Sequence, residues 1–445
     1  MLDEKEASNE YVLKTVKNKN IKLISLWFTD ILGFLKSFDI TPRELETALT
    51  NGSGFDGSSI EGFARIDESD MIALPAPTTF QVIPWSLPQY PVARMFCDIL
   101  KPGGEPFEGD PRYILKRNLQ RATAQGYTFN VGPELEYFYF KNAGGTDILD
   151  EGGYFDLTPP DIASDLRLET VLTLEQMGIS VQCSHHEVAT SQHEIDMHYS
   201  DALTMADNIM TARLAIKEIA QKHGIYATFM PKPIFGINGS GMHVHQSLFK
   251  DDRNAFFDRN NPYYLSEIAR HYIAGLLEHA PEITAVVSQW VNSYKRLVSG
   301  YEAPVYLSWA RRNRSDMIRV PDYQPGTENS TRVEFRVPDP ACNPYLAFSV
   351  MLAAGLEGIE KEYALADPIE ENVFEMSSEE REQRGIGSLP MNLSDAISLT
   401  EKSELVRKAL GDHLFDSFVK NKKIEWDRYR TQVTEYELKR YLPIL

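Results

Sequence analysis

Cysteine is scarce in this chain, which also lacks long apolar runs and an excess of positive charge. Its 445 residues include three cysteines, too few and too scattered for a disulfide framework or a thiolate zinc site. No apolar run approaches the roughly 20 residues of a membrane span, and the chain starts acidic and polar where a secretory signal would be basic and then apolar. The net charge of −19 repels phosphate backbones and anionic lipid. We therefore expect a cytoplasmic protein that binds neither nucleic acid nor a membrane.

Length and composition indicate a large globular protein. The chain exceeds the roughly 250–300 residues at which one hydrophobic core stops growing, so we expect two domains or one elaborated domain. Strand-like runs at residues 21–30 and 92–100 precede a cluster of Pro and Gly at 101–106, which breaks both helix and strand. We place a domain boundary there. Beyond it, apolar spacing predicts two helices, at 203–223 and at 265–279, the latter ending before Pro281.

Two acids share one face of a predicted strand at residues 129–140. The two-residue period of a strand places Glu134 and Glu136 together, with Leu135 and Tyr137 on the opposite face. The two carboxylates would repel each other, and a divalent cation between them would relieve that repulsion. A solvated strand edge could carry the same pair of acids without any ion.

Further candidate ligands follow along the chain. Glu187 and Glu194 stand among apolar residues that favour burial, and buried acids need partners. A Gly-rich bend at residues 236–241 leads into a strand that places His243 and His245 on one face. A neutral imidazole could complete a carboxylate-rich metal site, although a single histidine is more often a hydrogen-bonded core residue.

Arginines cluster in the last third of the chain. In the segment RVEFR, strand alternation places Arg332, Glu334 and Arg336 on one face. Cross-strand pairing on a surface could explain this pattern, but more guanidinium groups crowd nearby, a density suited to bidentate capture of carboxylate and phosphate. These nearby arginines are Arg296, Arg312, Arg314 and Arg319. The residues together indicate a metal-dependent, phosphate-handling enzyme, and since no Walker loop or kinase motif set occurs, nucleotide would be held in another way.

Several longer motifs follow one another along the chain. They are FDGSS at 55–59, GPELE at 132–136, SHHE at 184–187, KP through NGSGMH at 232–243, NSYKR at 292–296, GYEAP at 300–304, NRS at 313–315 and PDPACNPY at 338–345. In these motifs, and over essentially its whole length, the chain resembles type I glutamine synthetase. The resemblance implies an α+β fold. A small N-terminal β-grasp-like domain would span residues 1–104, and a large catalytic α/β domain, 105–445, would form the active-site funnel from an antiparallel sheet.

The resemblance also implies an activity and an assembly. The reaction is ATP-dependent condensation of glutamate and ammonia to glutamine through γ-glutamyl phosphate, in nitrogen assimilation, with at least two Mg²⁺ or Mn²⁺ ions per site. Sites lie between neighbouring subunits of a homo-dodecamer of two stacked hexameric rings, and the C-terminal tail inserts into the opposite ring. A small regulatory protein is a possible further partner. A γ-glutamyl-amine ligase of the same fold and a non-catalytic oligomeric scaffold are the alternatives.

Site roles follow from the resemblance, motif by motif. Glu134, His243 and Glu334 would hold the ion nearer the nucleotide, and Glu136, Glu187 and Glu194 the ion nearer glutamate. The implied substrate residues for glutamate and ammonium are Asn238, Gly239, Arg296, Glu302, Arg336, Tyr154 and Ser59. The implied nucleotide residues are His245, Ser247, Arg314, Arg319 and Lys232. The implied catalytic residues are Asp56 from the adjacent subunit, Glu302 as a lid, Arg314 and Arg336.

Regulation would follow one branch of the family. Phe374 replaces the tyrosine that is adenylylated in another branch, so we expect no adenylylation. The segment EGFAR at 61–65 resembles the branch inhibited directly by glutamine, with Arg65 as the candidate regulatory residue. The alternative for Arg65 is a surface arginine paired with Asp67 or Glu68.

Overall fold

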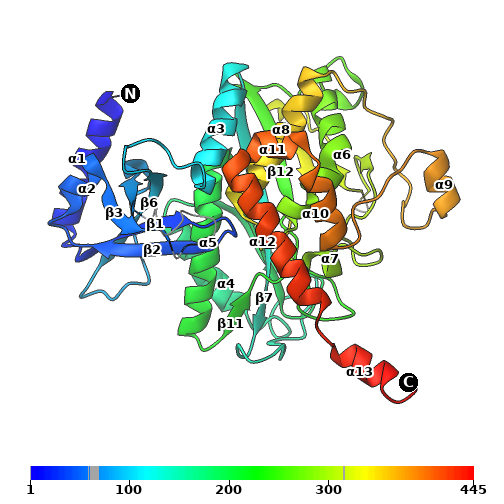
Figure 1. The fold of residues 1–445 in the computed structure, drawn as a ribbon, viewed down its shortest axis with the longest axis horizontal. Helices are drawn as coiled ribbons and strands as arrows, with labels where there is room; N and C mark the ends of the chain where they lie inside the picture. Colours follow the sequence, from blue (N-terminus) through cyan, green and yellow to red (C-terminus); the bar gives the residue numbers. More distant parts are fainter. Residues whose placement is uncertain (1, 59, 61–69, 314–315) are drawn as a thin grey trace.

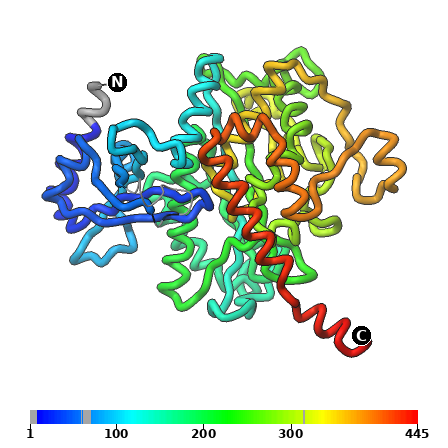
Figure 2. Tube along the Cα trace, viewed as in Figure 1, coloured from blue at the N-terminus to red at the C-terminus, as the bar shows by residue number. Residues whose placement is uncertain are grey.

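The computed structural model describes residues 2–58, 60, 70–313 and 316–445, with side chains from residue 8 onward. A small N-terminal domain lies beside a much larger one, and the C-terminal helix projects away from the body of the large domain (Figures 1 and 2). The segment 101–110 connects them, and the boundary predicted at residues 104 and 105 stays a prediction. In the described part of the chain, no helix combines the length and apolar character needed to cross a membrane.

The N-terminal domain is a sheet in the order β2-β1-β6-β4-β3, with β5 on β6. Strands β1 and β6 run parallel, and the other described pairs of this sheet are antiparallel. The predicted strands at 21–30 and 92–100 correspond to β1 and β6. The elements are α1 (Leu2–Asn18), β1 (Leu23–Thr29), β2 (Leu35–Ile40), α2 (Leu45–Asn51), β3 (Ser53–Asp56), β4 (Asp70–Pro75), the 3-10 turn Pro77–Thr79, β5 (Gln81–Val82) and β6 (Val92–Leu100).

Helices α1 and α2 were not predicted from the sequence. The buried apolar side chains of α1 include Val12 and Val16, one turn apart in a strongly charged segment, and α2 buries Leu45, Ala48 and Leu49. The apolar faces of these two helices are too narrow to be recognised from the sequence. They nevertheless pack against the sheet and complete the hydrophobic core of the small domain.

The large domain is built on a sheet in the order β14-β15-β16-β12-β7-β9-β8. Described pairs are antiparallel except β14 with β15, which agrees with the predicted antiparallel sheet. Short strands β10, β11 and β13 pair at its margins. The strands are β7 (Thr128–Phe140), β8 (Val181–His186), β9 (Gln192–Met197), β10 (Ser200–Asp201), β11 (Tyr226–Thr228), β12 (Val244–Lys250), β13 (Arg253–Asn254), β14 (Trp309–Ala310), β15 (Ile318–Arg319) and β16 (Val333–Phe335).

Helices pack behind this sheet, and α8 is buried among them because it is apolar nearly all round. Its approach to α6 is close enough to require glycine: a Cβ on Gly275 would lie 2.2 Å from the Ala354 carbonyl oxygen. The helices are α3 (Pro111–Ala124), α4 (Ser164–Gln176), α5 (Ala202–Lys222), α6 (Glu267–Val287), α7 (Ser293–Arg296), α8 (Pro344–Glu360), α9 (Ser378–Gln383), α10 (Leu393–Glu401), α11 (Glu404–Leu410), α12 (Asp412–Arg430) and α13 (Glu435–Tyr441), with 3-10 turns at Pro262–Tyr264 and Glu328–Ser330.

The predicted end of the second helix was wrong. Helix α6 continues through Pro281 to Val287. The residues beyond the proline, among them Ile283 and Val286, are buried. Proline costs one backbone hydrogen bond, and burial of this apolar turn outweighs that loss. The first predicted helix, at 203–223, is confirmed as α5.

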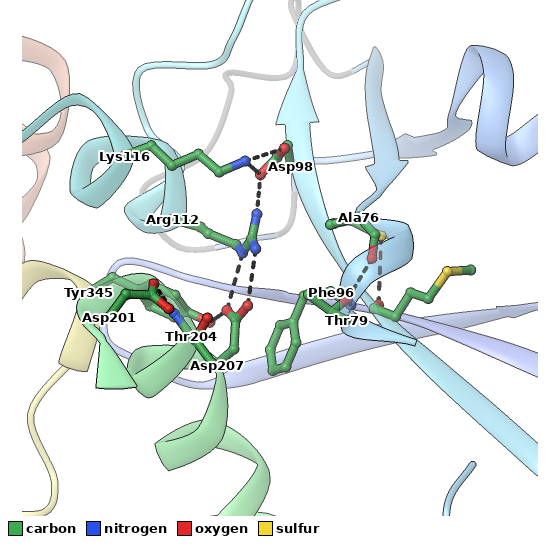
Figure 3. A network of polar contacts seen from close by, with 12 residues as sticks. Ala76, Thr79, Phe96, Asp98, Arg112, Lys116, Asp201, Thr204, Asp207 and Tyr345 are labelled. Atoms are coloured by element: carbon green, nitrogen blue, oxygen red, sulfur yellow. Dashed lines mark hydrogen bonds and ion pairs between the residues drawn. The ribbon is translucent and has the colours of Figure 1, made fainter. Parts of the chain in front are cut away.

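One buried arginine ties the two domains together (Figure 3). Arg112 of α3 donates to Asp98 of β6 and, through Nε and Nη2, to both oxygens of Asp207 of α5 at 3.1 and 3.0 Å. The Tyr345 hydroxyl of α8 donates to Asp207 at 2.6 Å, and Lys116 donates to Asp98. A strand of the small domain and three helices of the large one thus meet at a single guanidinium, which forms charge-assisted bonds.

We predict that Asp207→Ala strongly lowers the thermal midpoint of unfolding. The change leaves Arg112 buried with Asp98 as its remaining acid partner in this network, and breaking such a buried pair costs about 3–5 kcal/mol. Calorimetry provides the measurement. The exposed pair of Lys439 and Glu435 supplies the control, since Lys439→Ala should leave the midpoint unchanged. Equal midpoints for the two variants would contradict the role given to Arg112.

Candidate active site

A cavity of about 570 Å³ opens over the face of the large sheet that carries the predicted acids. A second cavity, of about 320 Å³, shares Glu134, Asp196 and Arg319 with it and is also lined by His245 and Ser247. The predicted site residues that line the first cavity are Glu134, Glu136, Tyr154, Glu187, Glu194, Asn238, Gly239, His243, Arg296, Glu302, Arg319, Glu334 and Arg336. Residues from widely separated segments therefore meet around one space.

Strand register explains how the acids meet. Across β7 and β9, Glu134 lies opposite Asp196, and Glu136 lies opposite Glu194. Across β9 and β8, Asp196 lies opposite Cys183, and Glu194 lies opposite His185. Residues directly opposite on one face have neighbouring side chains. The sheet thus presents two parallel rows to the cavity, Glu134–Asp196–Cys183 and Glu136–Glu194–His185.

Glu134 is the centre of the first candidate metal group. Its carboxylate lies 2.8 Å from His243 Nδ1 and 2.8 Å from His245 Nε2, so the two histidines share a face as predicted. One ligand atom from each of Glu134, His243 and Glu334 lies within 4.8 Å of the others. Arg332 donates to His245 Nδ1 at 3.2 Å, which leaves Nε2–H of that ring to donate to Glu134.

Glu334 lies between two guanidinium groups. It is fully buried and accepts a bond from Arg319 Nε and one from Arg336 Nη1, each of 2.5 Å. Burial opposes ionisation of this carboxyl, but the charge of Arg336 outweighs it and lowers the pKa of Glu334 to about 2. This end of the cavity therefore holds a carboxylate that stays charged.

The second candidate group is compensated less, since the charge of Arg296 lowers the pKa of Glu136 by less than its burial and the nearby acids raise it. Burial and the nearby Glu187 raise the pKa of Glu136 to about 8, although its carboxylate accepts bonds from Gln192 Nε2 at 2.8 Å and from the Gly241 amide at 3.0 Å. Burial and Glu136 raise the pKa of Glu194 well above its usual range. His185 lies 3.6 Å from Glu194 and 3.8 Å from Glu187.

The donor chemistry of both groups fits divalent ions. Carboxylate oxygens, with one imidazole in the first group, are ligands that Mg²⁺ and Mn²⁺ accept. Crowded buried acids with raised pKa values carry repulsion that a cation would relieve. The predicted set Glu134, His243 and Glu334 is compatible with one bound cation. In the second predicted set, Glu187 and Glu194 approach each other together with His185, and Glu136 lines the same cavity, which is compatible with a second cation of unspecified kind.

A further cluster of titratable side chains, buried on the face of the sheet opposite the cavity, is not suited to bind a metal ion. Asp150, His186 and His193 approach one another, with His186 Nε2 at 2.8 Å from Asp150. The Arg167 guanidinium, which can only donate, lies 2.9 Å from His193 Nδ1, so the hydrogen of this ring sits on Nε2. That nitrogen then has no lone pair for a metal. The group is a hydrogen-bonded polar network beneath the strands that carry His185 and Glu194.

Backbone contacts fix the remaining cavity groups. Arg296 is buried and donates to the carbonyls of Val337 and Arg336, which holds its guanidinium against the wall. Asn238 donates to Glu302 at 3.1 Å. Glu302 is exposed and has a φ of 57°, a left-handed conformation that is uncommon outside glycine and typical of functional loops.

Some predicted residues are not brought to these cavities. Asp56 is exposed at the end of β3 and accepts a bond from the Ser58 amide, which lowers its pKa. Lys232 bonds to the Ile237 carbonyl and stands 3.9 Å over the Tyr301 ring. Arg312 pairs with Asp322 on the surface. Ser59, Arg65 and Arg314 lie outside the described residues, so their predicted roles stay predictions.

Sequence reasoning missed four polar residues of this site. Gln192 holds Glu136, and Cys183, His185 and Asp196 complete the two rows. The sequence did contain a signal for Cys183, His185 and Asp196. Strand alternation puts Asp196 on the same face as Glu194, and it puts Cys183 on the same face as His185.

Comparison with known proteins identifies the family. The model for the glutamine synthetase catalytic domain matches residues 108–441, and the model for the glutamine synthetase β-grasp domain matches residues 20–102. The chain belongs to the glutamine synthetase family. Its N-terminal β-grasp domain and large catalytic domain are those of the family, which confirms the predicted resemblance and fold class.

Relatives that match the chain over nearly its whole length support the same family. Glutamine synthetase of Mycolicibacterium smegmatis is 52% identical over 445 residues, covering 99% of this chain and all of the relative. The enzyme of Methanosarcina mazei is 51% identical over 446 residues and 99% of both chains. These matches confirm the predicted ligase class and glutamine synthesis as the function, while the regulatory branch stays a prediction.

Solved structures share the fold. A GmaS/ADP complex superposes with a TM-score of 0.89 at 32% identity, over 97% of this chain and 99% of that one. Plasmodium falciparum glutamine synthetase superposes with a TM-score of 0.88 at 24% identity, over 97% and 98% of the two chains, which supports the fold alone.

We predict that Gly239→Ala lowers kcat/KM for glutamine formation by about 100-fold, the loss expected from a small displacement of substrate groups. A Cβ at Gly239 would lie 2.3 Å from the Pro231 carbonyl oxygen and would push the turn that carries Asn238 out of the cavity. Steady-state kinetics provides the measurement. Gly145→Ala, at a glycine with open space around it, should leave the kinetics unchanged. If the Gly239 variant had wild-type kinetics, the turn at Gly239 would not be part of the active site.

Proposed function

We propose that the 570 Å³ cavity is the site where glutamate, ammonia and ATP react to form glutamine, ADP and phosphate through γ-glutamyl phosphate. The observation that carries the proposal is the shared position of two carboxylate groups and three arginines around one cavity, in a chain of this family. Carboxylates suit the metal ions of phosphoryl transfer, and guanidinium groups suit anionic substrates.

Glu134, His243 and Glu334 would hold one divalent ion, and Glu136, Glu187 and Glu194 a second. When bound, Mg²⁺ or Mn²⁺ would neutralise negative charge on the ATP phosphates and on the transferring phosphoryl group. The crowded acids around Glu136 support this assignment, since their mutual repulsion falls when a cation enters.

The arginines of the cavity would orient the reacting groups. Arg336 and Arg319 face the shared Glu334, so each presents a guanidinium whose position is already fixed. In our proposal Arg296 and Arg336 bind glutamate and its transferring phosphoryl group, and Asn238, Gly239 and Tyr154 complete the glutamate pocket. Glu302 lies on an exposed strained loop and would close over the intermediate to exclude water.

Nucleotide would occupy the second cavity, which adjoins the first through Glu134, Asp196 and Arg319. His245 and Ser247 line it, and the GmaS/ADP complex, 32% identical to this chain, supports a nucleotide site in this fold. Lys232 is tied to the Ile237 carbonyl and lines neither cavity, so its contribution would be to hold the loop before Asn238.

The ammonium site would be completed by a neighbouring subunit. Asp56 is exposed and lines neither cavity of its own chain among the described residues. We propose that it enters the neighbour's cavity, binds ammonium and takes its proton, in a dodecamer of two hexameric rings. The C-terminal tail projects from the body of the chain (Figure 2). Its exposed apolar side chains, among them Leu442 and Ile444, support an insertion of this tail into the opposite ring.

Phosphate release from ATP tests the proposed reaction. Purified protein with glutamate and Mg²⁺ should release phosphate rapidly with ammonium and slowly without it. A γ-glutamyl-amine ligase would instead respond to a primary amine more strongly than to ammonium, and a non-catalytic scaffold would respond to neither.

We predict that Glu334→Ala lowers the rate of glutamine formation on the order of 1,000-fold. The change removes a metal ligand and leaves Arg319 and Arg336 facing each other without a counter-charge. Glutamine formation is measured together with Mn²⁺ binding, which should weaken in parallel. Glu278→Ala, at an exposed position of α6, is the control. Near-normal turnover in the Glu334 variant would exclude the metal assignment.

Mixed oligomers test the shared site. Chains with Asp56→Ala or with Glu134→Ala should each be inactive as homo-oligomers. A ring repeats one head-to-tail interface, so random co-assembly of the two should rebuild roughly a quarter of the sites. We expect co-expressed, doubly tagged oligomers to recover a similar fraction of wild-type activity and mixtures of preassembled parents to recover none. Correctly assembled mixed oligomers without activity would place Asp56 in the site of its own chain.

A further inference from the structure

Cys183, His185 and Asp196 form a cluster at the outer edge of the two side-chain rows. Cys183 and Asp196 are direct cross-strand partners, and the thiol donates to Asp196 Oδ2 at 2.8 Å. His185 follows Cys183 by two residues on the same face of β8. One ligand atom from each of the three lies within 4.8 Å of the others.

One oxygen of this cluster has no partner. Asp196 Oδ1 is buried and accepts no hydrogen bond from an N–H or hydroxyl group of the described residues, and the acid beside Asp196 is Glu194. A buried carboxylate oxygen without a donor is costly, and a cation is one group that would satisfy it. The polar network beneath the sheet does not offer this opportunity, because its His193 Nε2 carries a hydrogen.

The donor set differs from that of the two carboxylate groups. Sulfur, imidazole nitrogen and carboxylate oxygen together favour Zn²⁺, Co²⁺ or Cd²⁺ over Mg²⁺. All three residues line the 570 Å³ cavity, and Cys183 is exposed, so an ion could enter from the cavity. Three protein ligands would leave a fourth position of a tetrahedral ion open towards the cavity.

We propose that Cys183, His185 and Asp196 form a third cation site, selective for thiophilic divalent ions. On binding, the thiol proton passes to solvent and a thiolate–metal bond forms. The ion also engages His185, which otherwise lies beside Glu187 and Glu194, and adds positive charge next to Glu134 in the same row. Occupation of the site therefore inhibits the enzyme.

Co²⁺ is the probe for the site, because a thiolate ligand gives it a charge-transfer absorption band. The full-length protein is first saturated with Mg²⁺ to fill the oxygen-rich groups and is then titrated with Co²⁺ in the absence of ATP and glutamate. We expect the band to saturate at one Co²⁺ per chain. Cys183→Ser should abolish it, and His185→Ala and Asp196→Ala should each weaken Co²⁺ binding at least about tenfold.

Cys97→Ala and Cys342→Ala are the controls, since both thiols are buried away from the cavity and the band should persist in either folded variant. Thermal melting confirms that each variant is folded. Zn²⁺ inhibition gives a second readout: the concentration for half-inhibition, taken relative to each variant's own rate, should rise at least about tenfold in Cys183→Ser.

Three results would overturn the proposal. These are a wild-type protein without the band, a band that survives Cys183→Ser, and Co²⁺ affinity that is unchanged in both His185→Ala and Asp196→Ala. The titration uses neither nucleotide nor glutamate, so its outcome is independent of the reaction proposed for the cavity.

Discussion

The register of β7, β9 and β8 is the constraint on which the site depends. The apolar sides of these strands, including Leu135, Tyr137 and Ile195, are buried in the main core, and the opposite sides carry the acids. A shift of one residue would exchange the two faces and bury the carboxylates among apolar side chains. The packing of these apolar side chains therefore fixes the positions of the acids, although the apolar side chains themselves do not line the cavity.

The two groups of acids in the cavity, one around Glu334 and one around Glu136, differ in how far positive side chains compensate their charge. Glu334 has Arg319 and Arg336 against it and a pKa near 2, whereas burial and Glu187 hold the pKa of Glu136 at about 8. Around Glu334 the arginines outweigh burial, whereas around Glu136 the charge of Arg296 does not, so a bound cation would complete the compensation there. We infer that the group around Glu136 gains more from cation binding than the group around Glu334.

Local periodicity predicted much of this site, because strand alternation is a property of a short segment. The shared face of Glu134 and Glu136, and that of His243 and His245, required no knowledge of distant residues. Pairing of β7 with β9 and of β9 with β8 is non-local, so Asp196 opposite Cys183 could not be derived from one sequence. The prediction that α6 ends before Pro281 was wrong for a related reason, since burial of the residues beyond the proline, which a single segment does not reveal, keeps the helix going.

The link between the domains extends to the strand that carries the acids. Arg112 joins Asp98 of the small domain to Asp207 of α5. The residue before α5 is Asp201, which belongs to β10. Strand β10 in turn pairs with β7, where Asp201 lies opposite Asn130. Asp56 belongs to the same small sheet as Asp98, through β3, β4 and β6. Each chain thus links Asp56 at the end of β3 to its own cavity through paired strands and the Arg112 network. In the ring that we propose, every subunit would repeat one geometry, so this path would set Asp56 of each chain at the same position relative to the cavity of the next.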